Sequence, residues 1–253
     1  MERVFITGAS SGIGAALALV YAQRGAQLGL VGRRAEALQA LAAGLPGDGH
    51  SIYVLDVRDR VALHAAAADF LQGGDVDVVI ASAGISVGTV TEALEDFEVF
   101  RAIYETNVLA TVATFEPFIA AMKARGQGRL VGIASVAGVR GLPGAGAYSS
   151  SKAAVRSYCE SLRVELHGSG VKVVTVSPGF IRTPMTARNP YRMPFLMPVE
   201  RFAQQAQRHI DKGRASVVIP WQMGAVAKLL RAVPAAIYDR LAARRKRKPR
   251  QGE

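Results

Sequence analysis

Seven short runs rich in Val, Ile and Leu alternate along the chain with longer stretches of helical spacing, and this alternation limits the fold more than any other feature. The runs are almost continuously apolar, as is typical of strands that are covered on both faces. Strand–helix–strand repetition predicts a parallel sheet with right-handed crossovers. We therefore predict an α/β fold, a single doubly wound domain with a mostly parallel, seven-stranded sheet. The predicted strands are 4–7, 27–31, 51–55, 77–81, 128–134, 171–177 and 216–219.

The helical stretches and the C-terminal region indicate the domain organisation. No change of composition marks a linker before residue 242, so we expect one domain over 1–241 and a disordered basic tail over 242–253. Residues 222–241 are predicted to form an apolar and basic helix that Pro234 bends or interrupts. The other predicted helices are 12–24, 34–43, 58–72, 97–125, 147–167 and 198–212.

Composition excludes several classes of protein. Half of the 253 residues are hydrophobic, which argues against disorder, and the single cysteine, Cys159, cannot form an internal disulfide. Because there is no Cys/His cluster and no apolar targeting segment at the start, we expect no metal site and a cytoplasmic protein. Glu116, Lys228 and Arg231 interrupt the longest apolar stretches, so no membrane span is expected.

The net charge of +11 is concentrated near the C-terminus. Nine basic and two acidic residues lie between residues 228 and 253, which accounts for +7 of the total. Nucleic-acid binding is not expected, because no aromatic residue follows Tyr238 to stack on bases. Two interpretations of 222–250 remain open. The segment is either an element that touches the surface of an anionic membrane, or a core- or dimer-packing helix followed by a solvated tail.

A glycine-rich turn connects the first predicted strand to the first predicted helix. It reads TGASSGIG from Thr7 to Gly14. Such a turn lets backbone N–H groups and the positive end of a helix approach a pyrophosphate. It can also serve close packing alone, but its position between strand and helix favours dinucleotide binding. We assign cofactor contacts to Gly8, Ser10, Ser11, Gly12, Ile13 and Gly14.

The end of the second predicted strand indicates which dinucleotide is bound. Twenty residues after Gly12 the chain reads Gly32-Arg33-Arg34, where NAD-selective sites usually carry an acid. The planar guanidinium group of Arg suits a phosphate. The alternative, two solvated arginines, conflicts with the helix dipole, which disfavours cations in a first turn. We therefore predict NADP(H) in preference to NAD(H), with Arg33 and Arg34 at the 2′-phosphate.

A tyrosine and a lysine are separated by four residues in a predicted helix. This spacing places Tyr148 and Lys152 on the same helix face, so that the ammonium group is expected to lower the pKa of the phenol. A tyrosine tuned in this way exchanges a proton near neutral pH. Thirteen residues upstream, Ser135 ends a predicted strand, and the carboxyl ends of parallel strands are where such folds bind ligands. We expect its hydroxyl to hold a carbonyl oxygen beside Tyr148.

Together these motifs resemble those of the short-chain dehydrogenases/reductases, and the resemblance extends from residue 2 to about residue 220. It implies a Rossmann-type domain in which Asp56 and Val57 contact the adenine ring and the segment from Pro178 to Thr183 closes over the nicotinamide. Asn107 stands where the family keeps its catalytic asparagine. Further cofactor contacts are implied at Ala83, Gly84, Pro178, Ile181 and Thr183.

The resemblance also implies a mechanism without a metal. Tyr148 gives a proton to the substrate oxygen or takes one from it, and Ser135 orients the carbonyl group. Lys152 lowers the pKa of the tyrosine and binds the nicotinamide ribose, while Asn107 holds a water that links the lysine to solvent. One departure is Ser82, which stands where the family usually has asparagine and is expected to cause a local rearrangement, such as a bridging water, without loss of activity.

The substrate is less defined. Residues 184–200 fall where the family has a mobile lid, and its Met and Phe side chains favour an apolar ketone, such as a long-chain 3-oxo lipid. Arg188 and Arg192 are positioned in the sequence to meet an anionic group, and the alternative is an ordinary lid that packs on its own domain. We expect a homodimer or homotetramer. A protein of a different class, a catalytically silent NADP(H)-binding regulator, is the competing hypothesis.

Overall fold

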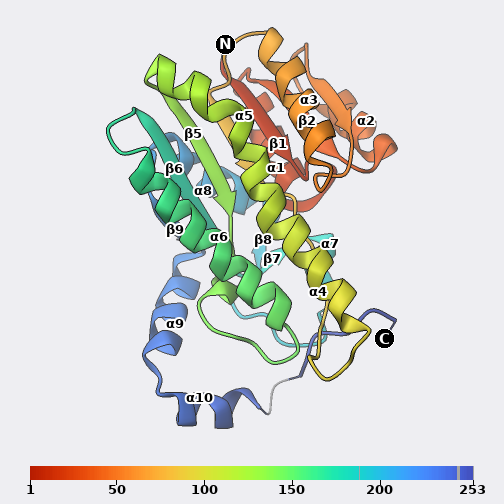
Figure 1. Cartoon of the computed structure of the whole chain (residues 1–253), viewed down its shortest axis with the longest axis vertical. Helices are drawn as coiled ribbons and strands as arrows, with labels where there is room; N and C mark the ends of the chain where they lie inside the picture. Colours follow the sequence, from red (N-terminus) through yellow and green to blue (C-terminus); the bar gives the residue numbers. More distant parts are fainter. Residues whose placement is uncertain (188, 244–245, 253) are drawn as a thin grey trace.

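The computed structural model describes residues 1–187, 189–243 and 246–252. Its central sheet has seven strands, all parallel, in the order β3-β2-β1-β4-β5-β6-β9 (Figure 1). The order reverses between β1 and β4, which is the switch point where doubly wound sheets bind ligands. The predicted α/β fold is therefore confirmed. The strands are β1 Arg3–Thr7, β2 Gln27–Gly32, β3 Ser51–Val54, β4 Val78–Ala81, β5 Gly128–Ile133, β6 Val171–Pro178 and β9 Ser216–Ile219.

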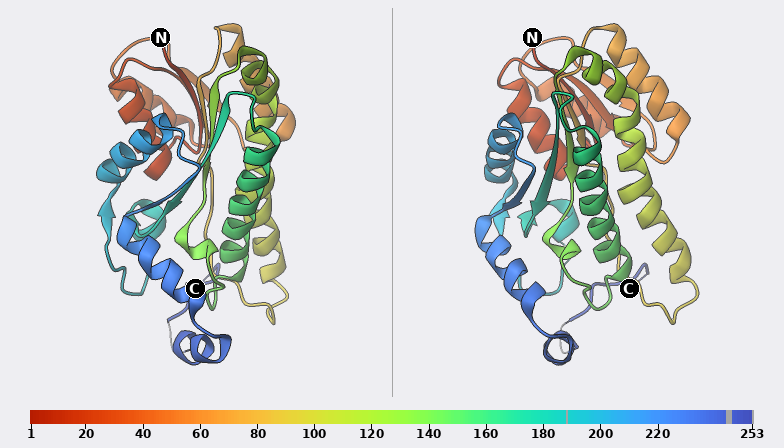
Figure 2. Two further views of the ribbon diagram at one scale, coloured as in Figure 1. Left: turned by 90° about the vertical axis from the view of Figure 1, so that its left-hand side faces the viewer. Right: turned by 60° about the vertical axis from the view of Figure 1, so that its left-hand side comes forward.

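Helices cover both faces of this sheet. The six helices concerned are α1 Gly12–Ala22, α2 Ala35–Gly44, α3 Arg60–Gln72, α5 Ala110–Arg125, α6 Gly146–Glu165 and α8 Val199–Asp211. One face is covered by α1, α2 and α8 and the other by α3, α5 and α6, so that the sheet lies between two helical layers (Figure 2).

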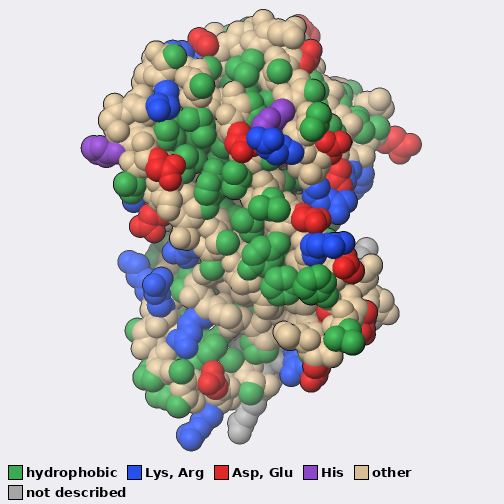
Figure 3. Space-filling model, viewed as in Figure 1, with side chains coloured by type: hydrophobic (Ala, Val, Ile, Leu, Met, Phe, Trp, Pro, Cys, Tyr) green, Lys and Arg blue, Asp and Glu red, His purple; other side chains and the backbone are tan. Residues whose placement is uncertain are grey.

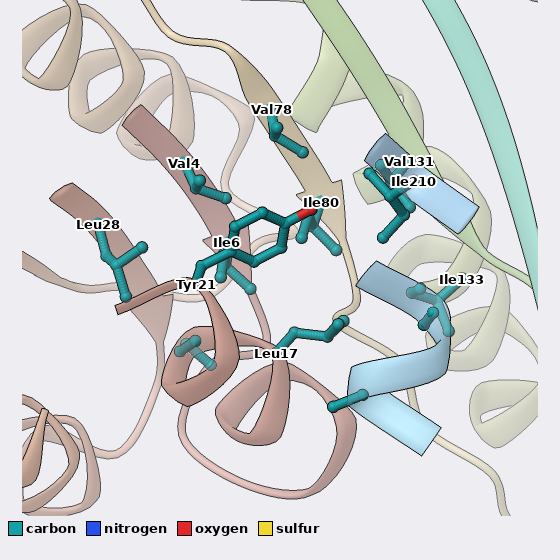
Figure 4. Packing of buried hydrophobic residues seen from close by; sticks show 14 of the residues in the cluster. Val4, Ile6, Leu17, Tyr21, Leu28, Val78, Ile80, Val131, Ile133 and Ile210 are labelled. Atoms are coloured by element: carbon teal, nitrogen blue, oxygen red, sulfur yellow. The ribbon is translucent and has the colours of Figure 1, made fainter. Parts of the chain in front are cut away.

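The strands supply apolar side chains to both layers in alternation. In β1, Val4 and Ile6 enter the cluster that contains Leu17 and Tyr21 of α1 (Figure 4), whereas Phe5 enters the opposite cluster. All five of these side chains have no exposed surface. Burial of one such side chain contributes about 1.5–3 kcal/mol. Because both faces of the sheet are buried, successive residues of each strand are apolar, and the strands appear in the sequence as continuous hydrophobic runs.

The long helix predicted over 97–125 is interrupted in the structure. It consists of α4 Asp96–Tyr104, a π-helical turn at Glu105–Leu109, and α5. A π-helical turn inserts an extra residue into the helical repeat, and here it holds the Asn107 side chain in a fully buried position.

The predicted helix over 222–241 is two helices, α9 Trp221–Ala232 and α10 Ala235–Ala242. Pro234 is the N-cap of α10, and because it has no N–H to donate, α9 does not continue through it. The carbonyl oxygens of Leu230 and Val233 accept hydrogen bonds from Arg140, and this arginine also stacks on Tyr238 of α10. The two helices are therefore fixed to the loop between β5 and α6.

The end of the chain differs from the disordered tail that the sequence predicts over 242–253. The described part, residues 246–252, runs back along the body, where Arg250 pairs with Gly88 in a parallel β-bridge (Figure 1). The Gly88 N–H donates to the carbonyl oxygen of Pro249 at 2.8 Å. Hydrogen bonds and ion pairs to the body replace the solvation that a free basic tail would have. Residues 244, 245 and 253 of the predicted tail lie outside the described residues.

Candidate active site

A cavity of about 400 Å³ opens at the carboxyl edge of the sheet, where β1, β4, β5 and β6 end. All the residues predicted to bind the cofactor line it, and so does Ser135. Of the predicted site residues, Asn107 alone does not reach the lining. The cavity is bounded by Gly8, Ser10, Ser11, Gly12, Ile13, Gly14, Arg33, Arg34, Asp56, Val57, Ala83, Gly84, Ser135, Tyr148, Lys152, Pro178, Ile181 and Thr183.

The glycine-rich turn forms one wall of this cavity. Gly8 has a φ of +71°, and a Cβ at this position would lie 2.7 Å from the Cα of Ala83 on the neighbouring chain segment. A Cβ at Gly14 would collide with the carbonyl oxygen of Gly8. The helix α1 starts at Gly12 without a side-chain cap from Ser11 and without an acid in its first turn. Its first N–H groups are therefore available to an anion, which fits the pyrophosphate of a dinucleotide.

Two arginines lie beside this turn at the end of β2. The Arg34 guanidinium donates to the Ser10 carbonyl oxygen at 2.9 Å and contacts the Ser10 hydroxyl at 3.3 Å. Arg33 is mostly exposed, with its Nη1 atom 3.8 Å from the Asp56 carboxylate. That carboxylate is held by Arg58 at 2.7 Å, and hydrogen bonds from Arg58 lower the pKa of Asp56. Arg33 is thus only weakly tied and is free to turn towards an anion in the cavity.

The opposite wall carries the predicted catalytic side chains. Tyr148 and Lys152 lie one turn apart on α6, and the Lys152 ammonium is 5.9 Å from the centre of the tyrosine ring. Lys152 donates to the Ile133 carbonyl oxygen at 2.8 Å, which ties it to the end of β5. The Ser135 hydroxyl oxygen caps a short 3-10 helix by accepting from the Ala137 N–H at 3.1 Å. Because that bond uses a lone pair, the hydroxyl hydrogen of Ser135 can be directed to the Tyr148 oxygen or to a ligand.

Burial dominates the electrostatics of these groups. It raises the pKa of Tyr148, while the hydrogen bond with Ser135 acts in the opposite direction. Burial also lowers the pKa of Lys152 to about 8. The sequence predicts a lowered pKa for Tyr148. The structure differs because the phenol is buried and because the Lys152 ammonium bonds to Ile133.

Asn107 lies behind the cavity wall. Its side-chain oxygen accepts from the Ile85 N–H at 2.8 Å, and its amide nitrogen donates to the Ile85 carbonyl oxygen and to Ser151. A Cβ at Gly84 would lie 3.2 Å from this oxygen and 3.4 Å from the Lys152 nitrogen. The absence of a side chain at Gly84 therefore lets the asparagine and the lysine approach the same point. The side chain fixes the segment after β4, while its predicted role in holding a water stays a prediction.

The predicted lid, 184–200, forms separate elements. It contains α7 Pro184–Ala187 and the strand β8 Met197–Pro198, which pairs with β7 Ile181–Arg182. Met185 lines the cavity, but Met197 is buried in the core beside α8, so the predicted apolar lining is only partly at the site. Arg192 is exposed, and Arg188 lies outside the described residues.

The motifs missed six residues of the cavity lining outside the predicted lid. Five of them are direct neighbours in sequence of predicted site residues, and Ile133 lies two residues before Ser135. Except for Thr106, they end or follow strands of the sheet, a position that no motif marks. They are Leu55, Ile85, Thr106, Ile133, Ala134 and Gly179, and the lid residues Pro184 and Thr186 also line the cavity.

Comparison with known proteins decides the family. A family model described as short chain dehydrogenase matches residues 2–192. An uncharacterized oxidoreductase of Myxococcus xanthus is 40% identical over 96% of this chain and 97% of its own length. The chain belongs to the short-chain dehydrogenase/reductase family. It is thus an oxidoreductase of a family that uses nicotinamide cofactors.

Other relatives and solved structures agree with this assignment. The mouse dehydrogenase/reductase SDR family member 7B is 38% identical over 71% of this chain and 58% of its own length. The crystal structure of levodione reductase superimposes with a TM-score of 0.78 at 25% identity, covering 88% of this chain and 98% of that one. A short-chain dehydrogenase from Streptomyces avermitilis has a TM-score of 0.77 at 24% identity over 96% of this chain and 95% of its own, which supports the fold alone.

Two further observations concern the described part of the chain. No helix there is both long enough and apolar enough to cross a membrane. No group of three or more His, Cys, Asp or Glu side chains within the described ranges is placed to hold a metal ion.

Proposed function

We propose that this oxidoreductase uses NADP(H) to interconvert a ketone and a secondary alcohol, with Tyr148 as general acid and base. The supporting observation is the meeting of Ser135, Tyr148 and Lys152 on one wall of a cavity whose other wall is the glycine-rich turn. Arg33 and Arg34 at the rim of the same cavity support the choice of NADP(H).

The chain's own residues account for the proton transfer. When bound, the reduced cofactor supplies a hydride to the carbonyl carbon of the substrate. Ser135 donates a hydrogen bond to the carbonyl oxygen, and Tyr148 gives that oxygen its proton. The raised pKa of Tyr148 keeps its proton in place at neutral pH, which suits donation during reduction. Lys152, fixed by Ile133, adds positive charge where the phenolate forms.

The test is a carbonyl panel with NADPH and NADH, followed by loss of the cofactor's absorbance. Tyr148→Phe keeps the ring and removes the proton, so turnover should fall by about 10² to 10⁴ while NADPH binding is retained. Tyr158→Phe removes a hydroxyl from the same helix, outside the cavity lining, and is the matched control. A Tyr148→Phe enzyme with more than a tenth of wild-type activity would require a different acid. Tight NADPH binding without turnover of any carbonyl would favour the silent regulator.

Exposed apolar side chains support assembly into a dimer or tetramer. Leu94, Phe97 and Leu109 in and beside α4 and α5 are 62–88% exposed. Phe100, on the same helix as Phe97, stacks on Tyr104. A second copy of the chain would remove this apolar surface from water.

A separate apolar surface supports contact with an anionic membrane. Trp221, Leu229 and Ile237 of α9 and α10 are more than half exposed. Figure 3 shows hydrophobic and basic side chains beside one another at the lower end of the molecule, where α10 lies in Figure 1. This combination is typical of helices that lie on a lipid surface.

A further inference from the structure

The last described residues of the chain pack beside Tyr148 and two neighbouring loops, outside the residues that line the cavity. We name residues 246–252 the C-terminal strap. The strap pairs with the segment after β4 through the bridge between Arg250 and Gly88, and it passes the segment before α6 at Gly144. The first segment follows Gly84 in the chain, and the second precedes Tyr148. The strap therefore contacts the segments on both sides of the site. In Figure 1 the end of the chain lies close to α4, on the same side of the molecule.

Two glycines make room for the strap. A Cβ at Gly88 would collide with the carbonyl oxygens of Lys248 and Pro249. A Cβ at Gly144, where φ is +69°, would lie 2.8 Å from the Arg247 Cβ. The body of the protein is therefore shaped to accept the strap at two separate points.

Arg250 anchors the strap. Its guanidinium pairs with Glu95 at 2.7 Å and with Asp96 at 2.9 Å. The Asp96 side chain is 7% exposed, and it also accepts from the Val90 N–H at 2.7 Å. A buried carboxylate with this set of donors gives the strap one defined position, because loss of the arginine would leave Asp96 with an unpaired buried charge.

The anchored strap brings Lys248 to the catalytic tyrosine. Its ammonium lies 5.8 Å from the centre of the Tyr148 ring, and Lys152 lies 5.9 Å from the same ring. Lys248 donates to the Ser86 hydroxyl at 2.7 Å. Among the described residues no carboxylate lies within 4.0 Å of Lys248, and burial lowers its pKa to about 8. Removing an ammonium group from water without a carboxylate partner costs free energy, and an anionic ligand would offset that cost.

We propose that the strap forms the outer wall of the substrate site and that Lys248 selects carbonyl substrates that carry a carboxylate, that is, oxo acids. The proposal rests on the carbonyl reduction proposed above. The carbonyl oxygen binds at Tyr148 and Ser135, and the carboxylate of the same molecule binds the Lys248 ammonium beside the tyrosine. The apolar remainder of the substrate then extends towards Met185, which lines the cavity.

The test compares each medium-chain 3-, 4- and 5-oxo acid with its methyl ester, which removes only the charge. The wild-type enzyme should prefer an acid to its ester in kcat/KM by about tenfold or more, as one charge-assisted contact predicts. Lys248→Met should lower kcat/KM for the acid and leave kcat/KM for the ester unchanged, which abolishes the preference. Lys248→Arg, which keeps the positive charge, should retain most of the preference. Lys246→Met, an exposed cation of the strap, is the matched control and should change neither substrate. The proposal would be overturned if Lys248→Met lowered kcat/KM equally for acid and ester, or if the wild type showed no preference for the acid.

A second variant tests the strap through the body of the protein. Gly88→Ala should displace the strap and reduce the acid preference, with NADPH affinity unchanged. Gly141→Ala, where a methyl group meets open space, is the control. A Gly88→Ala enzyme with full acid preference would refute the role of the strap.

The two proposals fail in different ways. Reduction of the esters by the wild type is the readout of carbonyl reduction itself. If neither acid nor ester turns over, calorimetry of the oxo acids on the NADPH-loaded wild type and Lys248→Met decides the present proposal. Weaker binding of the acid by the variant supports it, and equal binding overturns it.

Discussion

The proposed preference for NADPH rests on two arginines whose exposed contacts can be exchanged for a phosphate. Arg33 is 3.8 Å from an Asp56 carboxylate that Arg58 already occupies, and its side chain is 64% exposed. Arg34 contacts Ser10 on the glycine-rich turn. A charge-assisted contact contributes about 1.5–3 kcal/mol, and solvent screening at these exposed side chains favours the lower part of that range. Arg33→Ala or Arg34→Ala should therefore weaken NADPH binding by about tenfold each.

The assay is calorimetry of NADPH and NADH on the wild type, the two variants and Arg163→Ala, a control on α6 whose ion pair with Glu160 is 3.9 Å long. NADH affinity should change by less than about threefold in every variant, because NADH lacks the phosphate. The NADPH affinity of the wild type should also fall more steeply with salt than its NADH affinity. Equal affinity of the wild type for both cofactors would refute the assignment, and so would variants that lose NADH as strongly as NADPH.

Three other predictions follow from the site and its surroundings. Gly14→Ala places a methyl group against the Gly8 carbonyl oxygen and should cost about a hundredfold in NADPH affinity by calorimetry, whereas Gly44→Ala, in open space, should be neutral; equal affinity of both variants would contradict this. Because burial lowers the pKa of Lys152 to about 8, its positive charge is lost as pH rises through that value, so kcat/KM for a neutral ester should decline there; a flat profile would contradict this. Anionic vesicles should sediment the protein at low salt and release it at high salt, less so for Ile237→Ser; no sedimentation at low salt would exclude the membrane contact.

The nucleotide side of the site could be predicted from the sequence because strand ends in a parallel sheet converge. Once the runs before Gly8, Asp56 and Ser135 are recognised as neighbouring or nearby strands, their following residues must meet at one edge. The sterically demanding positions, Gly8 and Gly14, are also visible in the sequence, since each permits a close backbone approach that a side chain would block.

Other features depend on contacts that no local pattern encodes. The π-helical turn that buries Asn107 lies inside the stretch 97–125 that the sequence predicts as one helix, because the residues on both sides of it are helical and no motif marks the inserted residue. Burial raises the pKa of Tyr148, against the predicted direction. Spacing on a helix places Lys152 nearby but reveals neither the burial of the phenol nor the hydrogen bond that holds the ammonium at Ile133.

The basic C-terminal region shows that a charge count does not place the individual charges. Six basic residues follow Leu241, and as a sequence they read as a solvated tail or a membrane contact. In the structure Arg250 is paired with Glu95 and Asp96, and Lys248 lies at the tyrosine. If both proposals hold, truncation after Leu241 would remove basic charge from the membrane contact and the strap from the substrate site in one step. The two effects separate by substrate, because lost membrane binding leaves the ratio of acid to ester turnover unchanged, whereas loss of Lys248 changes that ratio in solution without any lipid.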